Sequence, residues 1–229
     1  MKEFQTGIWD TIYSTVAATL VACVLGIILG IILVAGEEDG VRPLPGPVMK
    51  VLNFAINILR SVPFLILMIM VLPLSELLVG TTIGTVASIP PLIIASASFV
   101  ARLVETSLRE VDKGVIEAAQ SMGCSPFQII WKVILPESLP SLVASFTTAF
   151  ITILATAHAG AIGGGGLGKI AINYGYYKYN YAVMLIAVVF IVVLVQIFQS
   201  LGTSLPPGRT TASPTGLGEE SSAGTSAGR

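Results

Sequence analysis

Residues 117 to 136 read EAAQSMGCSPFQIIWKVILP. The stretch is amphipathic, and Gly123, Pro126 and Pro136 interrupt its apolar pattern. Long apolar segments without charge lie on either side of it, at 77–101 and 138–162. Because each flanking segment has the length and composition of a membrane span, the stretch between them is expected to be a loop that faces water.

The composition of the whole chain agrees with a membrane protein. Of 229 residues, 54% are apolar and 11% are charged, and the mean hydropathy is +0.87. Soluble domains average about 25% charged residues, and a spanning helix needs roughly 20 apolar residues. We therefore expect an all-α polytopic membrane protein with about five transmembrane helices and a cytoplasmic two-helix loop. The expected spans are 11–36, 61–75, 77–101, 138–162 and 179–202.

The second span has the weakest pattern. It contains Pro63 and Pro73, and Arg60 precedes it within a helical pattern that begins near Met49. Its helix is therefore expected to begin in the membrane interface. A proline-bent helix provides irregular backbone that can line a cavity, so Pro63 is a candidate for the translocation path.

The first span is expected to be a retained helix and not a cleaved signal peptide. Glu3 and Asp10 disrupt the basic leader that a signal peptide needs, and the apolar run is too long.

The basic residues indicate an orientation. They are more numerous at the span ends that lie on the side of the 117–136 loop, which by the positive-inside rule places the amino terminus outside and the carboxyl terminus in the cytoplasm. With a net charge of −1 and no basic patch, the chain is not expected to bind nucleic acid. The cytoplasmic set is Arg42, Lys50, Arg60, Arg102, Arg109, Lys113 and Lys132, and the outer set is Lys2, Lys169 and Lys178.

The chain divides into a membrane domain and a tail. From residue 204 onward it is rich in Ser, Thr, Gly, Pro and Ala, so it cannot bury enough apolar surface to offset the entropy of ordering. We expect a transmembrane domain over 1–203 and a disordered tail over 204–229, which is a solvated linker or an artefact of expression.

Helical spacing predicts the first helix of the loop. Val115, Ile116, Ala119 and Met122 recur on one face, and Gly123 then provides a residue that tolerates a left-handed helix end.

The second helix of the loop has a strong start signal. Ser125 is a capping residue, Pro126 fits the first helical position, and Gln128 completes a capping box. This helix is expected to run to about Leu135, where Pro136 and Pro140 stop it and lead into the next span.

The loop has the features of a docking element. Ala118 and Ala119 are small enough to enter a narrow groove, and Val115, Met122 and Phe127 offer apolar anchors. The alternative is an amphipathic helix that lies on the bilayer surface.

The role of the charged residues in and beside the loop is open at this point. Glu117 either pairs with a cation of a partner or faces water. Arg102, Glu105 and Arg109 share one helix face, and we interpret them as a charge cluster beside a gate.

The segment GGGGLGKI at 163–170 resembles a phosphate-binding loop but has Ile170 where such a loop needs a Ser or Thr. Its glycines favour close helix approach and tight turns. They form either a flexible external gate beside the translocation path or a plain re-entrant turn. The candidate gate residues are Gly163, Gly164, Gly165 and Gly166.

His158 is the only histidine and lies in the fourth span. An ionisable group in a membrane is a functional candidate, so His158 serves helix packing, the substrate path or a proton relay. The chain shows no Ser-His-Asp set and no metal-ligand cluster, and Cys23 and Cys124 form no pair. We expect no enzymatic activity, no metal and no cofactor in this chain.

The 117–136 loop resembles the cytoplasmic coupling loop of ABC importer permeases. That pattern is EAA, a Gly four residues after the second Ala, nine further residues and then Ile-x-Leu-Pro. Three longer segments, 58–73, 101–123 and 159–177, resemble the permeases of bacterial methionine ABC importers. The matching loop residues are Glu117, Ala118, Ala119, Gly123, Leu135 and Pro136, with Val133 at the Ile position.

The resemblance implies a multi-pass subunit of the bacterial plasma (inner) membrane that moves D- or L-methionine inward by alternating access. It implies a homodimer with two ATP-binding cassette subunits, which hold ATP and Mg²⁺, and a substrate-binding protein outside. The alternatives are an importer of another small amino acid or peptide, or a stand-alone carrier or channel. The residues expected to couple the chain to the ATPase subunit are Glu117, Ala118, Ala119, Met122, Gly123, Leu135 and Pro136.

Overall fold

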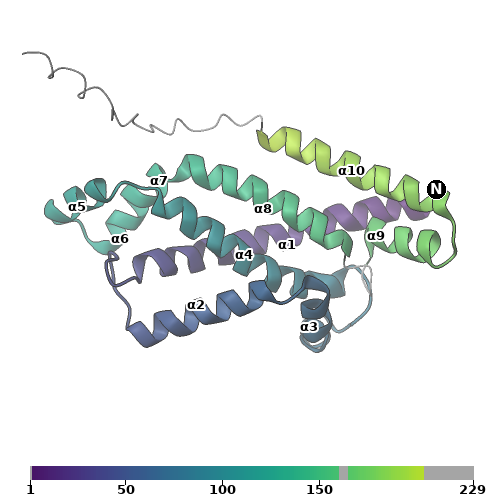
Figure 1. Cartoon of the computed structure of the whole chain (residues 1–229), viewed down its shortest axis with the longest axis horizontal. Coiled ribbons are helices and arrows are strands. Elements are labelled where there is room, and N and C mark those ends of the chain that lie inside the picture. The colour runs from purple at the N-terminus through teal and green to yellow at the C-terminus, as the bar shows by residue number, and fades with distance from the viewer. Residues whose placement is uncertain (1, 160–164, 204–229) are drawn as a thin grey trace, which may run out of the picture.

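The computed structural model describes residues 2–159 and 165–203, and all regular structure among them is helical (Figure 1). The predictions for Gly163, Gly164 and the tail at 204–229 fall outside these residues, as does the side chain of His158. The helices are α1 (Lys2–Ala35), α2 (Gly46–Ser61), α3 (Phe64–Val79), η1 (Val86–Ser88), α4 (Ile89–Arg109), α5 (Lys113–Ser121), α6 (Pro126–Ile129), η2 (Ile130–Ile134), α7 (Leu135–Glu137), α8 (Leu139–Ala159), α9 (Gly166–Ile170), η3 (Ala171–Tyr176) and α10 (Tyr181–Thr203).

The all-α membrane fold is confirmed. Three runs of the described residues are long and apolar enough to cross a membrane: Glu3–Ala35, Val86–Arg109 and Tyr181–Ser200. Two bent helix pairs bring the number to as many as five, as predicted. The α2–α3 pair bends by 110°, and the pair formed by Pro126–Glu137 and α8 bends by 70°.

The second span differs from its prediction. The chain does not form one helix over 61–75 but breaks at Val62, whose ψ of 127° is extended, immediately before Pro63. A proline disfavours the helical conformation in the residue before it and cannot donate a backbone hydrogen bond. The break therefore has a local cause, whereas Pro73 is accommodated within α3.

The third span was predicted at 77–101, and this range is wrong. Helix α3 ends at Gly80 with a left-handed φ of 74°, and α4 starts at Ile89 and continues to Arg109. Two prolines in the first turn of α4 suit its start, because the first helical N–H groups need no partner. The helix extends beyond the apolar run because its charged side chains pair with one another, as described below.

Helices α1 and α4 form the centre of the bundle. A Cβ atom on Gly26 would lie 2.5 Å from Cγ1 of Val100, and one on Gly30 would lie 2.5 Å from Cγ1 of Val104. Small residues at four-residue spacing let two membrane helices approach closely. The sequence GIILG on α1 is thus the reason that α1 and α4 pack along their lengths.

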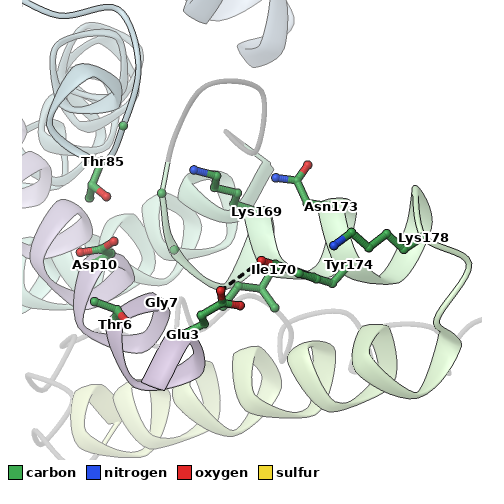
Figure 2. A pocket seen from close by; sticks show the side chains of 13 residues that line it. Glu3, Thr6, Gly7, Asp10, Thr85, Lys169, Ile170, Asn173, Tyr174 and Lys178 are labelled. Atoms are coloured by element: carbon green, nitrogen blue, oxygen red, sulfur yellow. Dashed lines mark hydrogen bonds between the residues drawn. The ribbon is translucent and has the colours of Figure 1, made fainter. Parts of the chain in front are cut away.

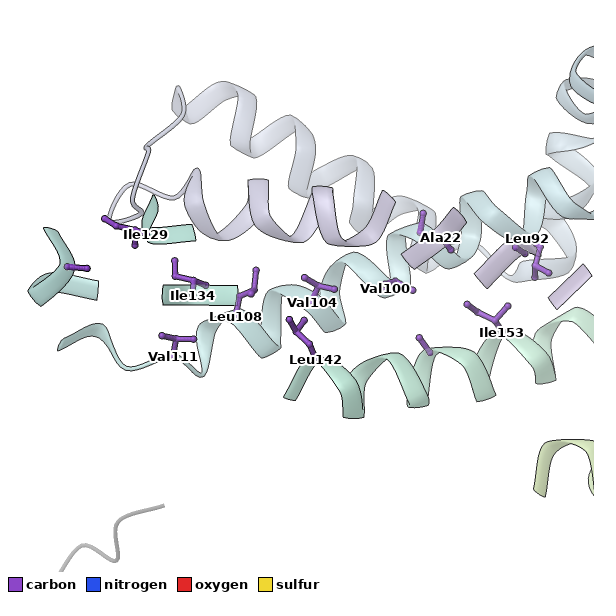
Figure 3. Close-up of a cluster of buried hydrophobic side chains, with 14 residues drawn as sticks. Ala22, Leu92, Val100, Val104, Leu108, Val111, Ile129, Ile134, Leu142 and Ile153 are labelled. Atoms are coloured by element: carbon purple, nitrogen blue, oxygen red, sulfur yellow. The ribbon is translucent and has the colours of Figure 1, made fainter. Parts of the chain in front are cut away.

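The two ends of the molecule have different structures. Figure 1 shows the start of α1, α9 and the start of α10 at one end, and the hairpin formed by α5, α6 and α7 at the other. Helix α8 returns from the hairpin along α4, where Ser107 Oγ and Ser145 Oγ lie 2.8 Å apart. The buried apolar cluster follows α4 from Leu92 to Leu108 and continues into the hairpin (Figure 3).

Candidate functional site

The first helix of the hairpin, α5, has a defined start and end. The carboxylate of Asp112 accepts a hydrogen bond of 2.6 Å from the Gly114 N–H. At the other end, Gly123 has a φ of +78°, and its N–H donates to the Gln120 carbonyl at 2.9 Å. The prediction of a left-handed glycine at this turn is confirmed.

The second helix starts with the predicted capping box. The Gln128 N–H donates to Ser125 Oγ at 3.4 Å, and the Ser125 N–H donates to Gln128 Oε1 at 2.9 Å. The predicted stop at Pro136 is wrong, because the helical path continues through η2 and ends at Glu137. Pro136 lies in the first turn of α7, where a proline is tolerated.

Apolar side chains cover the outer surface of the hairpin. The exposed fractions are 76% for Met122, 69% for Phe127, 57% for Trp131 and 44% for Val115. We refer to these four residues as the hairpin patch. A cluster of large exposed apolar side chains is typical of an interaction surface.

The inner side of the hairpin belongs to the bundle core. Ile129 and Ile134 are buried in the apolar cluster that includes Leu108 of α4, and Leu135 packs against it. Ala119 is also buried, so it holds the hairpin together and offers no surface to a partner, in contrast to the sequence interpretation.

The remaining predicted coupling residues lie on the outside. Glu117, Ala118 and Pro136 are exposed, beside the hairpin patch. Trp131 was not among the predicted residues, although its spacing of four residues from Phe127 places both on one helix face.

A charge network lies where α4 leads into the hairpin. Glu105 is nearly buried, and its two carboxylate oxygens accept hydrogen bonds from Arg102 at 2.6 Å and from Arg109 at 2.8 Å. The three residues of the predicted charge cluster are therefore in direct contact, with Glu105 bonded to both arginines. Their neutralised charges allow α4 to carry ionisable groups near the end of a span.

The network also connects α4 to two other segments. Arg102 Nη2 donates to Asn53 Oδ1 at 2.8 Å and to Asn57 Oδ1 at 2.9 Å, both on α2, and Arg109 pairs with Glu37 in the turn after α1. The arginines thus fix α1, α2 and α4 to one another beside the hairpin.

A cavity of about 580 Å³ lies at the opposite end of the molecule (Figure 2). Charged side chains of both signs line it, with Glu3 and Asp10 on α1 and Lys169 and Lys178 on the segment after the glycine run. A membrane protein end with mixed charges is suited to contact with water or with polar partners.

Tyr174 connects the two sides of this cavity. Its hydroxyl donates to Glu3 Oε1 at 3.1 Å, and the Lys178 ammonium lies 4.3 Å from the centre of its ring. The hydrogen bond to Glu3, together with the charge of that carboxylate, raises the pKa of the Tyr174 phenol.

The two described glycines of the predicted gate are tightly packed. Gly166 has a φ of +88°, and a Cβ atom there would lie 2.5 Å from Thr11 Oγ1, which accepts a hydrogen bond from the Leu167 N–H at 3.0 Å. A Cβ atom on Gly165 would overlap Thr85 Oγ1. Close approach therefore requires glycine at both positions, and their role as a gate remains a prediction.

Within the part of the chain that the structure describes, no group of three His, Cys, Asp or Glu side chains is placed to hold a metal ion.

The comparisons with known proteins agree on one class. The family model described as "Binding-protein-dependent transport system inner membrane component" matches residues 24–210. The chain is 51% identical over 160 residues to the probable D-methionine transport system permease protein MetI of Vibrio cholerae, covering 69% of this chain and 71% of the relative. It is 53% identical over 156 residues to the methionine import system permease protein MetP of Bacillus subtilis, covering 68% and 70%.

A solved structure of the MetNI methionine ABC transporter in inward-facing conformations has the same fold. Its matching chain is 37% identical, with a TM-score of 0.85 over 89% of this chain and 94% of that one.

Proposed function

The chain belongs to the family of binding-protein-dependent transport system inner membrane components, and we propose that it is the permease subunit of an ABC importer for methionine. The observation that carries the proposal is the similarity, at 51% and 53% identity, to permeases named for methionine transport. In this reading the subunit moves D- or L-methionine into the cytoplasm across the bacterial plasma membrane.

The energy for transport comes from partner subunits. Two ATP-binding cassette subunits hold ATP and Mg²⁺ and hydrolyse the nucleotide, and this chain pairs with a second copy of itself. A substrate-binding protein delivers the solute on the outer side. The amino terminus and the charged cavity then face outward, and the hairpin and the carboxyl terminus face the cytoplasm.

The hairpin is the element that receives force from the ATPase. Met122, Phe127 and Trp131 offer a partner groove three large apolar anchors. Because Ile129 and Ile134 are buried against α4, movement of the patch displaces α4 and not only a loop.

Alternating access requires two states that the ligands stabilise differently. The network around Glu105 joins α1, α2 and α4 at the hairpin end, so a displacement of α4 reaches the broken α2–α3 helix. Closure of the ATP-bound subunits then shifts the equilibrium between inward-open and outward-open forms.

Transport by the whole complex tests this function. The chain is co-expressed with the ATPase subunit, purified, reconstituted in liposomes with the substrate-binding protein, and supplied with labelled methionine. We expect uptake of labelled methionine to require ATP and to stop when the ATPase variant is inactive. Excess unlabelled D- or L-methionine should reduce the uptake. If another amino acid or a peptide competed more strongly than methionine, that solute would be assigned as the substrate. Uptake without the ATPase would favour a stand-alone carrier.

A further inference from the structure

A second cavity, of about 390 Å³, lies at the break between α2 and α3. Ser96 and Phe99 of α4 line it, and they lie on either side of the middle of the Val86–Arg109 span. Figure 1 likewise shows the α2–α3 break between the two ends of the molecule. The cavity is therefore near the middle of the membrane-spanning region. Its described lining is Leu59, Arg60, Val62, Pro63, Phe64, Ala95, Ser96, Phe99, Thr152 and Ile153.

Arg60 is the one charged residue in that lining. Arg102 and Arg109 of α4 both have carboxylate partners, but among the described residues no hydrogen bond or ion pair is found for the Arg60 side chain. Arg60 is exposed in the last turn of α2, so its guanidinium is open to a solute that enters the cavity. A cation without a carboxylate partner on the wall of a cavity can attract the anionic group of a solute, and a charge-assisted hydrogen bond to it is about twice as strong as a neutral one.

The other walls suit an apolar group. Phe64, Phe99 and Ile153 come from three different helices, α3, α4 and α8, and line the same cavity. The volume lies within the range of about 300–1,000 Å³ that is usual for small-ligand sites. One cation and an apolar wall together fit a small molecule that has a carboxylate at one end and an apolar side chain at the other.

The backbone at the cavity adds to this preference. The chain is not helical at Val62 and Pro63, and the first turn of α3 has no side-chain cap. Broken membrane helices direct the positive end of a half-helix toward anionic solutes in other transporter folds, and the start of α3 here lies on the same cavity as Arg60.

We infer that this cavity binds the transported amino acid, with the Arg60 guanidinium donating hydrogen bonds to its carboxylate and Phe64 and Phe99 contacting its apolar side chain. The inference rests on the proposed function and assigns the solute a site within the permease. The competing role of Arg60 is that of a charge that anchors α2 at the lipid headgroups, as the charge pattern along the sequence suggested. An anchor affects topology and not solute affinity.

Binding of labelled methionine to the permease–ATPase complex in lipid nanodiscs, without the substrate-binding protein, separates these roles. Arg60→Gln is expected to weaken binding about ten- to hundred-fold, as for loss of a charge-assisted hydrogen bond. Arg60→Lys is expected to lose less affinity than Arg60→Gln, because the ammonium keeps the positive charge. It should still bind more weakly than wild type, because it lacks the planar fork of the guanidinium. Lys50→Gln is the matched control, since Lys50 is an exposed cation on the same helix outside the cavity and should bind as the wild type does.

A second probe tests the carboxylate directly. Methioninol, which has the same side chain but no carboxylate, should compete with methionine at least ten-fold more weakly on the wild-type complex and about equally on Arg60→Gln. The inference would be overturned if methioninol competed as well as methionine on the wild-type complex. It would also be overturned if the affinity of Arg60→Gln for methionine were within two-fold of the wild-type affinity. Should Arg60→Gln fail to assemble with the ATPase, the comparison of methioninol with methionine on the wild-type complex decides alone.

The binding assay and the uptake assay fail independently. If the complex imports methionine but binds none without the substrate-binding protein, the site inference is wrong and the proposed function stands. If the complex binds methionine through Arg60 but imports none with ATP, the site stands and the proposed transport function is wrong.

Discussion

Phe127 and Trp131 lie one turn apart on the outer side of the hairpin, with ring centroids 5.9 Å apart and planes inclined by 47°. The rings contact each other, yet both side chains remain more than half exposed. Contact between them restricts their rotamers, so less side-chain entropy is lost when a partner covers them. The pair is therefore suited to be the energetic centre of a protein interface.

Removing this aromatic pair should weaken association with the ATPase subunit. Phe127→Ala and Trp131→Ala are each expected to cost about 2 kcal/mol of binding, or roughly 30-fold in affinity. The stability of the permease should change little, because both side chains are exposed. Association is measured on permease in nanodiscs. The control is Trp9→Ala, because Trp9 is also exposed but belongs to the start of α1, which lies at the other end of the molecule from the hairpin. Unchanged affinity in both aromatic variants would remove the hairpin patch from the interface.

Gly123 should be needed for efficient coupling. Its φ of +78° costs a residue with a Cβ atom roughly 1–2 kcal/mol, although no neighbouring atom would contact that Cβ. Gly123→Ala should therefore change the angle between α5 and α6 and raise the number of ATP molecules hydrolysed per methionine imported. Gly123→Asn should stay close to wild type, because asparagine tolerates the left-handed conformation. The same ratio in Gly123→Ala and wild type would contradict this account of the turn.

Glu105 should stabilise the hairpin end of the bundle. Glu105→Ala removes a nearly buried carboxylate that accepts hydrogen bonds from Arg102 and Arg109, and each such bond contributes about 1.5–3 kcal/mol. The midpoint of thermal unfolding in detergent is expected to fall by several degrees. Glu110→Ala, which removes an exposed carboxylate at the end of the same helix, should leave the midpoint nearly unchanged. Equal midpoints for the two variants would show that the network does not stabilise the fold.

Gly30 should be required for the close contact between α1 and α4. In Gly30→Ala the new Cβ atom would lie 2.5 Å from Val104 Cγ1 and 3.1 Å from the Ala101 carbonyl oxygen. Overpacking of this kind typically costs 1–3 kcal/mol, so we expect lower thermal stability. Gly46→Ala is the control, because no atom lies within 4 Å of its new Cβ position. A variant at Gly30 as stable as the one at Gly46 would mean that α1 moves aside without cost.

The local structure of the hairpin was predictable from the sequence. The turn at Gly123 and the capping box of Ser125 and Gln128 depend on backbone conformation and on hydrogen bonds over three residues. Such signals act over short distances, so residue types alone identify them. The number of spans was predictable for a similar reason, because it depends on the length of apolar runs.

Features that depend on tertiary contacts were not predictable in the same way. Hydropathy placed the third span at 77–101, because a hydropathy pattern ends a span at the first charged residue. In the structure Arg102 is neutralised by Glu105 and bonded to Asn53 and Asn57 on another helix, so the helix continues past it. The inward packing of Ala119 follows from how α5 rests on the core, which the helical period alone does not determine.

The central claim is that this chain moves its solute only when an ATPase acts on its hairpin. The direct measurement is accumulation of labelled methionine against a gradient in liposomes that contain either the permease alone or the complete ATP-supplied complex. The account predicts accumulation in the complete complex and none above the outside concentration with the permease alone. Accumulation by the permease alone, driven by an ion gradient or by membrane potential, would contradict it.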